Sequence, residues 1–173
     1  MGIRHTGSDM FKAEPIQVVD KTQHYQELAE QMRGLLSDER DRIANAANFS
    51  SLVFNSLPAL NWAGFYFYDG NELVVGPFQG QPACVRIAIG KGVCGTAAAT
   101  RQTQLVRDVH EFEGHIACDS ASQSEIVVPL FDGDRLIGVW DVDSPDVARF
   151  DDEDRIGMER LAGIFVDSIR AES

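Results

Sequence analysis

Three cysteine residues, Cys84, Cys94 and Cys118, are the side chains of this sequence best suited to covalent chemistry. Nine residues separate the first two and 23 separate the last two, unlike the closely spaced cysteine pairs of structural zinc sites. An odd number of cysteines also does not suit a secreted, disulfide-stabilised fold. Three roles stay open for such a thiol: packing in the core, binding zinc together with His110 or His115, and acting as a nucleophile.

Cys118 lies among small and polar side chains in the segment GHIACDSASQSEI, residues 114–126. Free cysteine is among the most buried residue types, so the pattern alone favours a packed Cys118. Glu125, near the end of the segment, has the pattern of a surface acid at the start of a strand. Long ordered loops in compact domains are usually functional, however, and the polar stretch 108–123 is such a loop.

Two helices are expected before the strands that must position these residues. Residues 20–36 place their apolar side chains on one helical stripe. A second helix is expected after an N-cap at Ser37, with Ile43 on its apolar side and Pro58 limiting its extent.

Alternating and aromatic residues then predict two hairpins, with turns at 69–71 and 132–134. Two shorter strands are expected between the hairpins, on either side of a short helix at 92–101. The expected strands are 61–68, 72–79, 84–90, 103–109, 125–131 and 135–144.

The last helix is expected over 151–169, capped by Asp151, with Asp154 at the capping-box position and Ile156 on the buried stripe. Hairpin-linked strands imply a mostly antiparallel sheet. Amphipathic helices at both ends of the chain imply that helices cover one face of that sheet. The expected fold class is therefore α+β.

Strand alternation separates two faces of this sheet. Trp62 and Tyr66 share one face of the first strand, and Asp141 and Asp143 share one face of the last. The residues between them are apolar and suit the core beneath the helices. A face that mixes aromatic rings with carboxylates is poor core and a reasonable small-molecule pocket. The alternative, which pattern alone favours, is that the two acids simply face water and that Trp62 is a core residue.

The net charge of −12 argues against nucleic acids and anionic membranes as partners. Residues 1–19 are expected to form a polar N-terminal leader, and residues 20–173 a single domain. The leader has no apolar stretch of the kind a signal peptide needs, and the odd cysteine count indicates a reducing compartment. We therefore expect a cytoplasmic protein.

Four motifs are more specific than these patterns: NWAGFYF, GVCGTAA, GHIACD followed by SEIVVP, and DVDSP. Over residues 20–170 their contexts closely resemble the free methionine-(R)-sulfoxide reductases, which are single GAF-domain enzymes. The resemblance implies a six-stranded antiparallel sheet with helices packed on one face and a ligand pocket on the other.

The resemblance also implies roles for individual residues. Cys118 would be the nucleophile, Cys84 the resolving thiol, and Cys94 a second thiol able to exchange disulfides. Glu125 is the candidate proton donor, because reducing a sulfoxide requires a proton delivered to its oxygen. The implied pocket residues are Trp62, Tyr66, Glu125, Asp141 and Asp143.

The implied activity is reduction of free L-methionine (R)-sulfoxide through a cysteine sulfenic acid and a disulfide. Thioredoxin, kept reduced by NADPH, would be the external reductant. The resemblance implies no bound cofactor and no metal in the protein itself. A homodimer is compatible with the family. The alternative is a GAF module without catalysis that binds a ligand or senses redox state through its cysteines.

Overall fold

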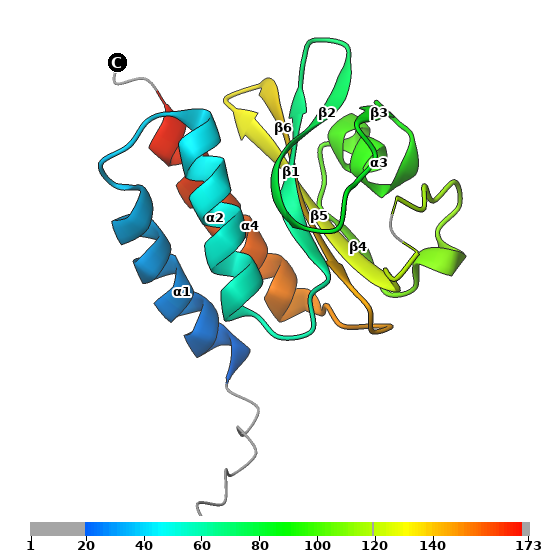
Figure 1. The fold of residues 1–173 in the computed structure, drawn as a ribbon, viewed down its shortest axis with the longest axis horizontal. Coiled ribbons are helices and arrows are strands. Elements are labelled where there is room, and N and C mark those ends of the chain that lie inside the picture. The colour runs from blue at the N-terminus through cyan, green and yellow to red at the C-terminus, as the bar shows by residue number, and fades with distance from the viewer. Residues whose placement is uncertain (1–19, 119, 171–173) are drawn as a thin grey trace, which may run out of the picture.

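The structure, a computed structural model, describes residues 20–118 and 120–170 as helices packed against a single sheet (Figure 1). The predicted leader, residues 1–19, lies outside the described residues. The elements in chain order are α1 Lys21–Leu36, α2 Arg42–Ser56, β1 Trp62–Tyr68, β2 Glu72–Gly80, β3 Arg86–Ala88, α3 Gly92–Thr100, β4 Gln104–Val106, the 3-10 helix η1 Val109–Glu111, β5 Ser124–Asp132, β6 Arg135–Ser144 and α4 Asp152–Ile169.

The sheet has six strands in the order β3-β2-β1-β6-β5-β4, and every neighbouring pair is antiparallel. The two predicted hairpins, β1–β2 and β5–β6, lie side by side because β1 pairs with β6. This pairing brings the aromatic strand beside the acidic strand. The predicted α+β class and the antiparallel sheet are confirmed.

Helices α2 and α4 cover one face of the sheet, and α1 packs against both of them on the side away from the sheet (Figure 1). Phe65 of β1 and Trp140 of β6 lie beneath them and pack against Phe49 of α2 and Phe165 of α4. The Trp140 indole N–H donates to the Met158 sulfur at 3.5 Å. Because Trp140 is fully buried on this face, it lies away from the acids on either side of it in the sequence.

The opposite face of the sheet is covered by α3, and the long loop between β4 and β5 reaches its rim (Figure 1). A second apolar cluster there contains Trp62, Tyr66 and Cys94, with Val127 and Val139 at its base. The sheet thus has two buried faces, and the second one carries the residues predicted to form the pocket.

Three details of the predicted helices are corrected. The second helix begins at Arg42 rather than after Ser37, because the Asp41 carboxylate accepts the Ala44 N–H at 2.8 Å and caps it. Ile43 and Ile156, expected on buried stripes, are 54% and 57% exposed.

The last helix has the predicted capping box between Asp151 and Asp154. Asp154 also accepts hydrogen bonds from Lys21 at 2.7 Å and from the Tyr25 hydroxyl at 2.7 Å. These contacts tie α1 to the start of α4. Within the described residues, no helix has both the length and the apolar character needed to cross a membrane.

Candidate active site

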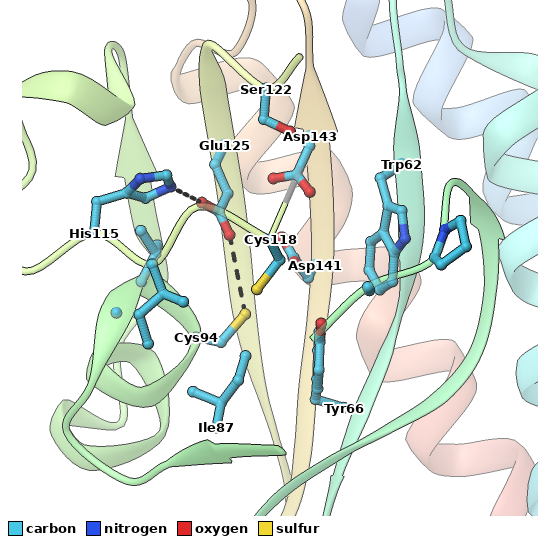
Figure 2. A pocket seen from close by; sticks show the side chains of 15 residues that line it. Trp62, Tyr66, Ile87, Cys94, His115, Cys118, Ser122, Glu125, Asp141 and Asp143 are labelled. Carbon is cyan, nitrogen blue, oxygen red and sulfur yellow. Dashed lines mark hydrogen bonds and ion pairs between the residues drawn. The ribbon is translucent and has the colours of Figure 1, made fainter. Parts of the chain in front are cut away.

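One small cavity lies between α3, the β4–β5 loop and the second face of the sheet (Figure 2). It encloses about 40 Å³, which is room for a few water molecules. Seven of the eight predicted site residues line it, and the eighth, Cys84, is bonded to one of them. The seven lining residues are Trp62, Tyr66, Cys94, Cys118, Glu125, Asp141 and Asp143.

The aromatic wall comes from β1. The Trp62 ring stacks on Tyr66 with ring centroids 5.7 Å apart, and its indole N–H donates to the Gln81 carbonyl at 3.1 Å. Gly64 lies between these residues, and a Cβ there would overlap Phe78 on β2. The missing side chain therefore lets β2 support the aromatic wall.

Three buried carboxylates form the facing wall. Strand register places Glu125 of β5 directly opposite Asp143 of β6, with Asp141 two residues further along β6. All three side chains are nearly excluded from solvent. Burial, then the neighbouring Asp143 and Glu125 carboxylates, raise the pKa of Asp141 well above its ordinary value.

One oxygen of Asp141, Oδ1, is buried and has no hydrogen-bond partner among the described residues. Buried polar atoms are normally paired, so this carboxylate oxygen is available to a polar group of a ligand. A cationic group is the natural ligand for such an oxygen.

Two of the three cysteines are joined in this structure. A disulfide links Cys84, just before β3, to Cys118 in the β4–β5 loop, and their Cα atoms are 5.3 Å apart. Cys118 thereby forms part of the cavity wall. The predicted pairing of a nucleophilic Cys118 with Cys84 is geometrically feasible, while the roles of the two residues stay predictions.

Cys94 is free and buried near the start of α3. Its Sγ lies 3.9 Å from Glu125 Oε1 (Figure 2). Burial, followed by the Asp141 and Glu125 charges, raises the pKa of the Cys94 thiol well above its usual range. Since the thiolate is the nucleophile in disulfide exchange, this environment disfavours the exchange role predicted for Cys94.

The structure adds His115, which the sequence prediction considered only as a zinc ligand. Its Nε2 lies 3.7 Å from Glu125 Oε2, and its ring lines the cavity (Figure 2). His110, the other histidine considered, pairs with Asp108 on the surface instead. His115 precedes Cys118 by three residues in the GHIACD motif, and that proximity was the only signal available in the sequence.

Three potential metal ligands converge in the same cavity. One ligand atom from each of Cys94, Glu125 and Asp141 lies within 4.8 Å of the other two. This set differs from the predicted zinc alternative, because it contains no histidine.

Comparison with known proteins agrees with this geometry. The GAF domain family matches residues 52–166. The free methionine-R-sulfoxide reductase of Escherichia coli is 50% identical over 143 residues, which cover 83% of this chain and 87% of that protein.

Solved structures similar to this chain also include a free methionine-R-sulfoxide reductase. The free methionine-R-sulfoxide reductase of Staphylococcus aureus in complex with its substrate is 51% identical, covers 84% of this chain and 95% of its own, and has a TM-score of 0.81. A Burkholderia vietnamiensis protein described as a GAF sensor is 70% identical, covers 87% and 99%, and has a TM-score of 0.84. The chain belongs to the GAF-domain family of free methionine-R-sulfoxide reductases.

Proposed function

We propose that this chain reduces free L-methionine (R)-sulfoxide to L-methionine in the cytoplasm, with thioredoxin as its reductant. The observation that carries the proposal is the placement of Cys118. It lies in a cavity with a buried acid cluster and an aromatic wall, and it is already bonded to the thiol that would resolve its sulfenic acid.

Substrate binding follows from the charges of the cavity. Asp141 and Asp143 supply carboxylates for the α-ammonium group, and the unpaired Asp141 Oδ1 gives that group a buried partner. The Trp62 ring offers an apolar face to the S-methyl group. Methionine sulfoxide within a peptide has no α-ammonium at this position, so the site favours the free amino acid.

The reaction begins with attack of the Cys118 thiolate on the electrophilic sulfur of the sulfoxide. Glu125 delivers a proton to the sulfoxide oxygen. The protonated oxygen then moves to the Cys118 sulfur as the bond between the two sulfur atoms breaks, which releases methionine and leaves Cys118 as a sulfenic acid. The Cys84 thiol then condenses with the sulfenic acid, forming the disulfide and one water molecule.

Recycling requires a dithiol from outside the chain. Thioredoxin exchanges with the Cys84–Cys118 disulfide and is itself oxidised, and NADPH restores it. Over one cycle, two thiol hydrogens and the sulfoxide oxygen leave as water, so the step needs no bound cofactor. A homodimer, which is compatible with the family, is also part of this proposal.

A redox-sensing role is the second candidate, because the 70% identical Burkholderia protein is described as a sensor. A sensor would form the same disulfide without consuming a sulfoxide. It would therefore oxidise with peroxide yet release no methionine from either sulfoxide epimer.

A coupled thioredoxin and NADPH assay with separated sulfoxide epimers tests both candidates. We expect turnover of the free R epimer, none of the S epimer and none of a peptide substrate. Cys118→Ser should abolish methionine release. Cys84→Ser should release a single equivalent and then stop, whereas Cys94→Ser should continue through many turnovers. Multiple turnover by Cys118→Ser would refute the mechanism.

A further inference from the structure

The lining of the cavity is rich in acidic side chains. It contains three carboxylates and the Cys94 thiol, and among the described residues neither lysine nor arginine is part of it. The imidazole of His115 is the one cationic candidate in that lining. Buried carboxylates with few basic neighbours favour the binding of a cation.

Three of these groups have the geometry of a metal site. One ligand atom from each of Cys94, Glu125 and Asp141 lies within 4.8 Å of the other two. Tetrahedral zinc with bonds of about 2.0–2.3 Å places sulfur and oxygen ligands roughly 3.5 Å apart. The Cys94 Sγ to Glu125 Oε1 distance of 3.9 Å is already near that value.

The unpaired Asp141 oxygen is a second, independent indication of a ligand. Asp141 is only 5% exposed, and its Oδ1 accepts no hydrogen bond from the described residues. Figure 2 shows Asp141 and Glu125 on adjacent strands facing Cys94 across the cavity. The cavity volume of about 40 Å³ has room for an ion and a water molecule.

We propose that Cys94, Glu125 and Asp141 form an inhibitory binding site for a thiophilic divalent cation of the Zn²⁺ class. The inhibition, though not the binding, rests on the proposed reductase function. The bound ion occupies Asp141, which would otherwise receive the substrate ammonium group, and it holds Glu125 as a carboxylate that has no proton to donate.

The chemical types of the three ligands determine which class of ion the site prefers. A thiolate with two carboxylates suits zinc and its close relatives, whereas magnesium and calcium prefer sites made entirely of oxygen ligands. Three protein ligands leave a fourth position for water. Coordination displaces the Cys94 proton, so binding strengthens as the pH rises.

Binding is tested on the oxidised protein, in which the disulfide leaves Cys94 as the only thiol of this three-cysteine chain. The probe is cobalt(II), followed by its thiolate-to-metal charge-transfer absorption and then displaced by zinc. We expect one ion per chain and a thiolate band. Cys94→Ser should lose the band and bind at least about tenfold more weakly.

A surface variant, Glu111→Gln, controls for non-specific binding and should bind cobalt(II) with the same affinity as the unchanged chain. Asp141→Asn is the second informative variant, because it removes one ligand while keeping the thiol. An unchanged cobalt affinity in both Cys94→Ser and Asp141→Asn, or no thiolate band in the unchanged chain, would overturn the site.

Inhibition is measured as single-turnover methionine release by pre-reduced protein freed of reductant, with and without zinc. Zinc should raise the apparent KM for the sulfoxide, and a chelator should reverse the effect. Each variant is compared with its own zinc-free rate. Equal inhibition of Cys94→Ser would place the effect on Cys84 and Cys118 and overturn the proposed regulation.

These experiments distinguish a failure of the proposed metal site from a failure of the proposed reductase function. If the chain binds cobalt through Cys94 but releases no methionine without metal, the reductase function is wrong and the metal site stands. If methionine is released and no ion binds, the metal inference is wrong and the reductase function stands.

Discussion

Replacing Glu125 with glutamine tests the predicted proton donor with little change in shape. The side chain is almost fully buried on β5, opposite Asp143, and glutamine has nearly the same size. Its amide oxygen can still accept from the Cys94 thiol, whose Sγ lies 3.9 Å from Glu125 Oε1. What Glu125→Gln removes is a dissociable proton and one negative charge of the acid cluster.

The size of the effect follows from these two losses. A positioned general acid contributes about 10²–10⁴-fold to the rate, or roughly 2.7–5.5 kcal/mol of barrier. The Glu125 charge is one cause of the raised pKa of Asp141, so its removal lowers that pKa and leaves Asp141 better able to bind an ammonium group. We therefore expect kcat to fall about 10²–10⁴-fold while KM changes by less than about threefold.

The assay is methionine release from the purified R epimer by pre-reduced protein in single turnover at varied sulfoxide concentration, with the rate constant at saturation in place of kcat and the half-saturating concentration in place of KM. Asp143→Asn is the contrasting variant, and it should act mainly on KM because it removes a contact to the ammonium group. Glu111→Gln, an exposed acid on η1, is the matched control and should change neither constant. A kcat within about threefold of the unchanged chain would exclude Glu125 as the donor.

Asp141→Asn should stabilise the protein in urea unfolding, by an amount that grows as the pH rises above about 4, because a carboxyl whose pKa in the folded protein is raised above 3.8 destabilises the fold increasingly above that pH. Exposed Asp134→Asn is the control, and a pH-independent difference would contradict the reasoning. Gly157→Ala should cost about 1–3 kcal/mol in thermal unfolding, since its Cβ would overlap the Tyr25 ring. Gly163→Ala, in open space on the same helix, should instead gain roughly 0.5–1 kcal/mol, and equal effects would refute the packing argument.

The two faces of the sheet were predictable because side chains of a strand alternate strictly. Phe65 and Trp140 lie beneath the helices and Trp62 and Asp141 line the cavity, as their positions in the sequence predict. The resemblance of the motifs added what alternation cannot provide, namely that the acids on the second face are covered by a loop and not by water. Pattern alone favoured the opposite for Asp141.

The sequence predictions were wrong where the sequence offered more than one local pattern or where tertiary packing decided the outcome. Ser37 and Asp41 both suit an N-cap, and only the hydrogen bond to Ala44 distinguishes them. Ile156 matches the helical period but lies at the edge of the stripe, where rotation of α4 against the sheet decides its exposure. His115 was not predicted as a pocket residue because its position depends on the path of an irregular loop.

The disulfide between Cys84 and Cys118 has a consequence for the order of events at the cavity. In the bonded state, the loop that carries Cys118 forms one wall of the cavity, and the Cys118 sulfur is already bonded to Cys84. The oxidised chain therefore has no Cys118 thiolate to attack a second sulfoxide until a dithiol has reduced the disulfide. The sulfoxide and the electron donor must therefore react with the protein in alternation.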